Sequence, residues 1–269
     1  MKSRPGPVAA VVKALLTVLY GIPLVWIVYT SFRPSSEVFA SPLVIHPTLA
    51  AYRDALTPDL LVALQQSVII AVGTTVLVLL IAIPAAYGLA RLRGAAVSVG
   101  LGLLIVLQMA PQTANLIPLF QVFGSTGLLD KTVGVILADA ALLSPFAIML
   151  LRPFFMSVPV QLEEAAAIDG ANLLRTFWQV VLPVARNGVF TVATLVFMLA
   201  WGEFLYAVNF FLSPGTYPLS ALLSQQVSAF GINWPGLMAL SVLTSVPILV
   251  LYAFSYRQLR DGLAVGAVK

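Results

Sequence analysis

The sequence contains no cysteine and one histidine, His46, and only 9% of its 269 residues are charged. The lack of cysteine excludes a disulfide framework, a thiol nucleophile and a cysteine-based metal site. No lysine follows a glycine, so the chain has no glycine-rich phosphate loop and is not itself a P-loop ATPase. A Gly-x-Ser-x-Gly elbow is also missing. We therefore expect no enzyme activity, no catalytic residue and no metal site.

What the chain has in excess is hydrophobic sequence. Hydrophobic residues make up 60% of it and the mean hydropathy is +1.01, whereas a soluble domain is roughly 45–50% apolar. A helix needs about 20 residues to cross a bilayer core of about 30 Å, and it satisfies every backbone group in lipid. We therefore predict an all-α integral membrane protein with six spans, at residues 8–30, 61–90, 97–120, 133–151, 184–212 and 236–256.

Basic residues predict the orientation of these spans. With the N-terminus inside, eleven of the 14 lysines and arginines fall on the cytoplasmic side, and three, Arg33, Arg53 and Lys131, fall outside. This asymmetry places both termini and the segment 152–183 in the cytoplasm. Because the basic residues are scattered at span ends, the net charge of +4 indicates membrane topology and not nucleic-acid binding.

The spans suggest three regions. The first is an N-terminal transmembrane helix with an outer loop (1–60), the second a transmembrane core that contains the loop 152–183 (61–256), and the third a cytoplasmic tail (257–269). Several spans contain proline, which removes a backbone hydrogen bond and tends to kink a helix. The prolines within spans are Pro23, Pro84, Pro111, Pro118, Pro145 and Pro247.

The loop between the fourth and fifth spans is unusually polar. Glu163, Glu164 and Asp169 lie within seven positions of one another, in a chain otherwise built for lipid. Pro159 favours the start of a short helix whose N-terminal end the acids stabilise, and Gly170 can end that helix in a left-handed conformation. The sequence therefore predicts an acidic helix that ends at a glycine turn.

A second short helix should follow the glycine turn. Asn172 is a suitable N-cap, the next ten residues carry one apolar face, and Pro183 is expected to end the helix before the fifth span. The two helices could simply lie at the lipid headgroups. Docking on a partner is the favoured alternative, because Ala165 and Ala166 allow another protein to approach closely.

The pattern Glu164-Ala165-Ala166-x₃-Gly170-x₉-Val180-x-Leu182-Pro183 resembles the EAA loop of inner-membrane permeases of ABC importers, with Val180 where isoleucine is commoner. In that family the loop docks on the ATPase subunit. The resemblance implies the type I ABC importer permease fold. It also implies that the coupling residues are Glu163, Glu164, Ala165, Ala166, Asp169, Gly170, Ala171, Leu182 and Pro183.

Further segments, in the same order along the chain, resemble permeases of carbohydrate importers of the maltose and trehalose type. These are residues 23–26 and 30–34, 85–91, 127–129, 168–171, and the small-residue tail 262–269. One position departs from the family pattern: Gly202 stands where an asparagine often follows the tryptophan of the fifth span, which puts the local cavity chemistry in doubt.

The resemblance also implies partners and a location. They are a second homologous permease, a dimeric ABC ATPase that uses ATP and Mg, an extracytoplasmic sugar-binding protein or lipoprotein, and the cell membrane of a bacterium or archaeon. No cofactor is expected on this chain. Alternatives are an ABC permease for a peptide, phosphate or polyamine, and an ion-coupled secondary transporter, which would need paired intramembrane ionisable residues and an inverted repeat.

Two acids lie within predicted spans, Asp139 and Glu203. A charged group near the bilayer centre costs roughly 2.5–3.5 kcal/mol, so it should face protein or water. An aromatic ring beside a carboxylate suits a sugar, and we predict a substrate path through Trp201, Glu203, Gln108, Asn115 and Asn209. The alternative role for Glu203 is a structural bond between spans, and Asp139 is expected to reach the outer interface.

Overall fold

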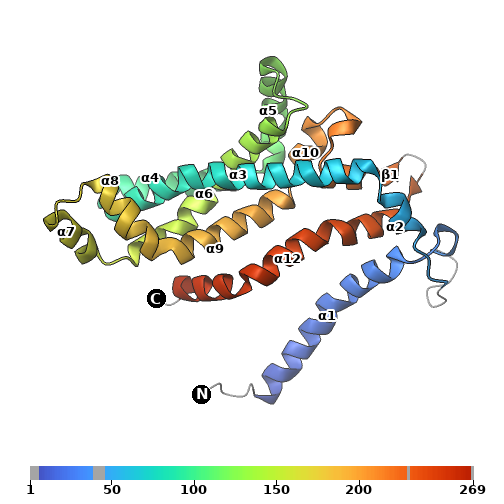
Figure 1. Ribbon diagram of the computed structural model, residues 1–269, viewed down its shortest axis with the longest axis horizontal. Coiled ribbons are helices and arrows are strands. Elements are labelled where there is room, and N and C mark those ends of the chain that lie inside the picture. Colours follow the sequence, from blue (N-terminus) through green and yellow to red (C-terminus); the bar gives the residue numbers. More distant parts are fainter. Residues whose placement is uncertain (1–5, 39–45, 229–230, 268–269) are drawn as a thin grey trace. The chain divides into compact units, whose positions relative to one another are not determined.

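The computed structural model describes residues 6–38, 46–228 and 231–267, which are built almost wholly of helices (Figure 1). The chain forms two compact units. The smaller unit combines Met1–Leu61 with Leu222–Pro247, and the larger combines Val62–Ala221 with Ile248–Lys269. Residues 222–247 thus cluster with the N-terminal part, and the division into three regions by membrane topology stays a prediction.

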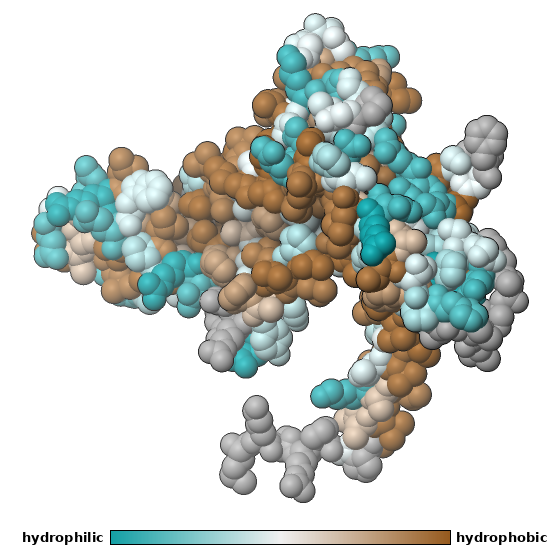
Figure 2. Space-filling view, turned by 45° about the vertical axis from the view of Figure 1, so that its right-hand side comes forward, coloured by the Kyte–Doolittle hydropathy of each residue, from teal (hydrophilic) through white to brown (hydrophobic). Residues whose placement is uncertain are grey.

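Within the described residues, five helices are long and apolar enough to cross a membrane, and a bent pair of helices makes a sixth candidate span. Figure 2 shows hydrophobic side chains gathered over the helices, as expected for a surface that faces lipid. The five helices are Val8–Ser31, Pro58–Arg91, Thr132–Met156, Leu173–Trp201 and Trp234–Tyr256. The predicted first, second, fourth and sixth spans are confirmed as single helices.

The third predicted span is not one helix. It consists of α4 (Ala95–Met109) and α5 (Gln112–Thr126), which meet at an angle of 86°. The break lies at Pro111, which has no N–H to donate to the preceding turn. Ala110, the residue before this proline, takes an extended conformation with ψ of 121°, as the proline ring favours. A continuous helix over 97–120 was therefore the wrong prediction.

The fifth predicted span is displaced toward the N-terminus. Helical structure runs from α8 (Leu173–Thr176) through a π-helical turn, η2 (Phe177–Val181), into α9 (Leu182–Trp201) without an end at Pro183. Pro183 follows directly on the π-helical turn, in which the Leu182 N–H bonds to the Phe177 carbonyl, and the helix continues past it. The helix stops at Trp201, so the predicted extension to residue 212 is also wrong.

The smaller unit joins the end of α1 (Pro7–Ser31) to α2 (Ala50–Ala55). The Ser31 hydroxyl lies 2.8 Å from the Tyr52 hydroxyl, and the Phe32 and Tyr52 rings pack with centroids 5.1 Å apart. No residue in the most apolar stretch of α1 is buried. The remaining elements are η1 (Ser35–Glu37), the antiparallel pair β1 (Val227–Ser228) and β2 (Gly231–Ile232), and the start of α12 (Trp234–Ala267).

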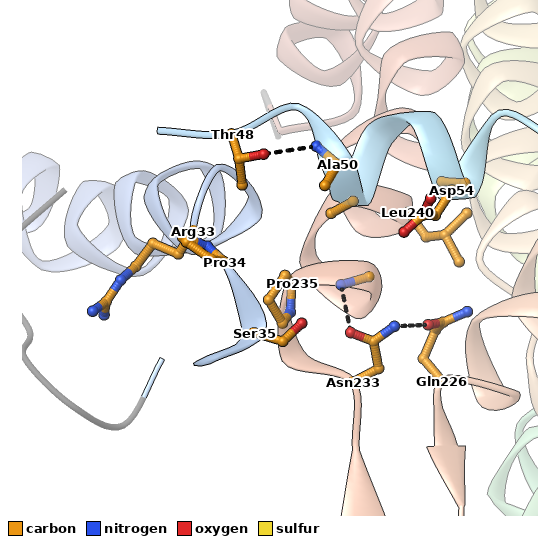
Figure 3. Close-up of a pocket in the computed structure, with 13 residues that line it drawn as sticks. Arg33, Pro34, Ser35, Thr48, Ala50, Asp54, Gln226, Asn233, Pro235 and Leu240 are labelled. Atoms are coloured by element: carbon orange, nitrogen blue, oxygen red, sulfur yellow. Dashed lines mark hydrogen bonds between the residues drawn. The ribbon is translucent and has the colours of Figure 1, made fainter. Parts of the chain in front are cut away.

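A polar pocket of about 360 Å³ lies within the smaller unit (Figure 3). Its lining includes Asp54 of α2 and the amides of Gln226 and Asn233. Asn233 donates to the Gln226 carbonyl oxygen at 3.0 Å and accepts from the Gly236 N–H at 3.2 Å, so it ties the strand pair to the first turn of α12. The Arg33 guanidinium points away from the pocket in Figure 3.

The larger unit is organised around α6 (Thr132–Met156), of which eleven residues are buried. It packs against α4, α9 and α10, and small residues allow the close approach. At Gly188 of α9 an added β-carbon would lie 2.2 Å from the Phe154 ring, and at Gly134 it would lie 2.4 Å from the Leu128 carbonyl oxygen. The other elements are α3 (Pro58–Arg91), α7 (Val160–Ile168), α10 (Leu205–Phe210), η3 (Pro214–Thr216) and α11 (Leu219–Ser224).

Asp130 ties two connectors of the larger unit together. Its carboxylate accepts from the Ser213 hydroxyl and from the backbone N–H groups of Leu212 and Ser213, at 3.0 and 3.1 Å. These bonds, with the Ser213 hydroxyl first, hold the pKa of Asp130 below its ordinary value. Since the charged form is the bonded one, this contribution to stability is present at neutral pH and is lost as the pH falls through the lowered pKa.

Replacing Gly134 with alanine tests the packing at the start of α6. The new β-carbon would meet a backbone carbonyl, which cannot rotate away, so we expect Gly134→Ala to destabilise the protein by about 1–3 kcal/mol. Gly102→Ala in α4 is the matched control, because no atom lies within 4 Å of its β-carbon position. Thermal unfolding in detergent should show a lowered midpoint for Gly134→Ala alone; equal midpoints would contradict this packing.

Candidate functional site

The acidic segment forms the short helix α7, closed by a glycine turn as predicted. Gly170 has φ of 81°, the left-handed conformation that glycine adopts without steric cost. Its N–H donates to the Ala167 carbonyl at 3.0 Å, and the Ala171 N–H donates to the Ala166 carbonyl at 2.9 Å. This pair of bonds is a Schellman motif, which satisfies carbonyls that the helix end would otherwise leave free.

The second helix begins as predicted at Asn172. Its side-chain oxygen accepts from the Arg175 N–H at 2.8 Å, so Asn172 is the N-cap of α8. The π-helical turn that follows buries Phe177 and Val181 and leads directly into α9. Helical structure is therefore continuous from the residue after Asn172 to the end of the fifth span.

Glu163 faces the spans. One of its oxygens accepts from the Arg91 Nε at 2.6 Å and lies 2.5 Å from Nη2, and the other accepts from the Tyr87 hydroxyl at 2.7 Å. The exposed fractions of the Arg91 and Glu163 side chains are 18% and 15%. We call the three side chains of Tyr87, Arg91 and Glu163 the clasp. It joins the last turn of α3 to α7.

Arg91 also binds the C-terminal end of α6. Its Nη1 donates to the Phe155 carbonyl at 3.0 Å, and its Nη2 donates to the Val158 carbonyl at 3.1 Å. In return, Arg152 of α6 donates from Nε to the Leu89 carbonyl of α3 at 3.0 Å. Local sequence signals do not indicate these contacts, because the partners are more than 60 residues apart along the chain.

The opposite side of the helix pair is exposed. Ile168 is 88% exposed and Leu173 is 72% exposed, although both are apolar. Five of the nine predicted coupling residues are exposed as well: Glu164, Ala165, Asp169, Gly170 and Pro183. The two neighbouring glutamates thus have different environments: Glu163 is bound within the molecule, whereas Glu164 is open to a partner.

Glu203, a predicted substrate residue, is engaged in holding α10. It accepts from the N–H groups of Tyr206 and Ala207 at 2.7 and 3.0 Å, and from the Gln112 amide at 2.9 Å. Glu203 and Trp201 line a cavity of about 10 Å³, room for roughly one water molecule. These contacts favour the structural role for Glu203, and Gln112 of α5 is the partner that the sequence did not indicate.

The other predicted path residues do not join this cluster through the hydrogen bonds of the described residues. Gln108 and Asn115 are exposed, and the Asn209 amide donates to the Leu205 carbonyl of its own helix at 2.6 Å. Trp201 stacks on Phe197 with centroids 5.9 Å apart. The path through these residues stays a prediction.

Asp139 does not reach an interface. Its side chain is fully buried in α6, and neither carboxyl oxygen has a hydrogen-bond partner among the described residues. The expectation of an interfacial position was wrong because the N-terminal part of α6 packs against α10, in the buried cluster that includes Ala138 and Tyr206. Across residues 6–38, 46–228 and 231–267, no three His, Asp or Glu side chains gather as a metal site.

Over most of its length the chain is similar to known proteins. Residues 79–264 match the family described as binding-protein-dependent transport system inner membrane component. The chain is 33% identical over 267 residues to the sulfoquinovosyl glycerol transport system permease protein SmoH of Agrobacterium fabrum, covering 98% of this chain and 94% of the relative. It is 32% identical over 273 residues to the trehalose transport system permease protein SugB of Mycobacterium tuberculosis, covering 100% of both.

A solved structure shares the fold. A chain from a bacterial ABC transporter involved in the import of the acidic polysaccharide alginate superposes with a TM-score of 0.77. The match covers 96% of this chain and 98% of the other, at 22% sequence identity. The expected type I ABC importer permease fold is therefore confirmed.

The glycine turn after α7 can be tested without any assay of function. Nothing lies within 4 Å of a β-carbon added at Gly170, so the cost of Gly170→Ala comes from the left-handed backbone alone, about 1–2 kcal/mol. Hydrogen exchange of the Gly170 and Ala171 amides should become roughly 5–30 times faster. Gly170→Asn is the control and should change less, since asparagine adopts this conformation more readily. Unchanged exchange in the alanine variant would contradict the assigned turn.

Proposed function

Because the chain belongs to the family of binding-protein-dependent transport system inner membrane components, we propose that it is a permease subunit of an ATP-driven carbohydrate importer. Two relatives that span nearly the whole chain support a carbohydrate, since their names specify sulfoquinovosyl glycerol and trehalose. The importer would contain a second permease, an ATPase dimer and an extracytoplasmic binding protein, with ATP and Mg used by the ATPase.

The exposed side of α7 and α8, opposite Glu163, supports a docking role for this segment. An apolar side chain as exposed as Ile168, beside the carboxylates of Glu164 and Asp169, suits a protein surface that carries both a hydrophobic pocket and basic groups. Moving a two-state transporter from 1:99 to 99:1 takes about 5.5 kcal/mol. One surface ion pair supplies about 1 kcal/mol at most, whereas a few buried contacts of about 2 kcal/mol each suffice.

Other functions fit less well. An ABC permease for a peptide, phosphate or polyamine would use the same helix pair, so only the transported solute separates it from the proposal. An ion-coupled secondary transporter has no ATPase to bind, and the exposed apolar and acidic side of α7 would then have no role.

Reconstitution tests the proposal. The chain, its companion permease, the ATPase and the binding protein would be incorporated into proteoliposomes, and uptake of trehalose and of sulfoquinovosyl glycerol would be measured. We expect uptake of one of them to require both ATP and the binding protein. A partner ATPase with its phosphate-loop lysine replaced is the control and should abolish uptake. Uptake that persists without ATP and stops with an ionophore would indicate a secondary transporter instead.

Orientation follows from the same proposal. With both termini in the cytoplasm, Ser36 of η1 should face outward and Gln161 of α7 inward. Both residues are exposed and the chain has no cysteine, so Ser36→Cys and Gln161→Cys each supply one reactive thiol. An impermeant maleimide added to whole cells should label only Ser36→Cys. Labelling of both variants from outside would contradict the orientation.

A further inference from the structure

We infer that the clasp of Tyr87, Arg91 and Glu163 is the joint through which movement of α7 is passed to α3 and α6. The inference rests on the proposed function and identifies positioning residues that act within the coupling step. Tyr87 and Arg91 lie outside the acidic segment, in the stretch 85–91 that resembles carbohydrate-importer permeases, and the resemblance implied no role for either side chain. Arg91 is central because it contacts α7, the last turn of α6 and the residues that link them.

The clasp is the main side-chain connection between α7 and the spans. No residue of α7 is buried, so the helix has no apolar core of its own to hold it against α3 or α6. Glu163 is the residue of α7 whose side chain bonds to a span in the described structure, and it makes those bonds with both oxygens. A displacement of α7 therefore acts on α3 through Glu163, and on the fifth span through its packing against η2 and its C-terminal chain end.

The geometry of the clasp is suited to transmit a displacement of α7 either toward α3 or away from it. The planar guanidinium places Nε and Nη2 on one oxygen of the carboxylate, and the Tyr87 hydroxyl holds the other oxygen, so both oxygens are fixed from α3. Tyr87 adds a third contact from one helical turn earlier in α3. A single flexible ion pair on the surface would not constrain the angle between two helices in this way.

From the clasp the movement has a direct route into the core. Arg91 of α3 donates to the Phe155 carbonyl at the end of α6, and Arg152 of α6 donates to the Leu89 carbonyl of α3. The two helix ends are therefore joined by a hydrogen bond from each helix to the other. Phe155 and Leu151 of α6 are fully buried in the cluster that includes α3 and α9. A shift of the α6 end therefore displaces side chains that α3 and α9 pack against.

Two neighbouring glutamates allow a matched test. Glu163→Gln keeps the shape but removes the charge and one acceptor from the clasp, whereas Glu164→Gln makes the same change on the exposed side. In proteoliposomes, Glu163→Gln should retain the ATPase on the permease and lower the solute carried per ATP hydrolysed about tenfold. Glu164→Gln should instead weaken retention of the ATPase. Tyr87→Phe, which removes a single hydroxyl, should lower the ratio less than Glu163→Gln.

A covalent replacement separates coupling from simple structural support. Since the chain has no cysteine, the double variant Tyr87→Cys with Glu163→Cys carries the only two thiols and leaves the bonds of Arg91 to the Phe155 and Val158 carbonyls in place. Without a linker it should hydrolyse ATP with little transport. A short bis-methanethiosulfonate reagent that bridges the two thiols should restore the transport per ATP, because it refastens α7 to α3 without the carboxylate.

The outcomes are distinct. If wild-type transporter shows no ATP-dependent uptake of trehalose or sulfoquinovosyl glycerol, the proposed function fails. If wild type transports and Glu163→Gln keeps its transport per ATP, the clasp is not the joint. Loss of ATPase retention in Glu163→Gln, or a bridged double variant that stays uncoupled, would assign the clasp to assembly and overturn the inference.

Discussion

The structure depends on the rule that every backbone N–H and C=O within lipid must be bonded inside the protein. The helices α3, α6 and α12 obey it over 34, 25 and 34 residues. At two of the places where helical structure stops, a side chain or a turn takes over the bonding. Glu203 accepts from the first N–H groups of α10, and the Schellman motif closes α7. The breaks in helical structure are therefore also the places where polar side chains gather.

The same rule explains where the charged side chains lie. The basic and acidic residues that the fold brings inward are bonded at helix ends, where unpaired carbonyls or N–H groups are available. Arg91 and Arg152 both donate to carbonyls of the neighbouring helix, and Asp130 accepts from the connector after α10. Asp139 is the exception, because it is buried with no hydrogen-bond partner among the described residues. Burying an ionisable side chain without a partner is expensive, which sets Asp139 apart from the other charged side chains of the larger unit.

Local sequence signals predicted the local structure well. The bounds of α7, the left-handed Gly170 and the N-cap Asn172 all follow from residue types that act on their immediate neighbours. Proline shows the limit of such signals. Pro84, Pro145 and Pro247 lie inside continuous helices, whereas Pro111 separates two helices by 86°. The same residue type gives both results, because packing around the helix decides whether the lost hydrogen bond becomes a break. Local signals could not predict the clasp either, since Glu163 lies 72 residues from Arg91 and 76 residues from Tyr87 along the chain.

The clasp is better explained by geometry than by stability. Taking two charges out of water can cost as much as their attraction returns, and apolar residues of similar size are often as stable in such a place. Removing one partner alone is different: it leaves the other charge buried and costs about 3–5 kcal/mol. An apolar pair in place of Arg91 and Glu163 would keep α7 near α3 but could not bond the carbonyls of Phe155 and Val158. Only a side chain with several donors in one plane holds a carboxylate and two carbonyls at once, so the arginine fixes the angle of α7 against two helices together.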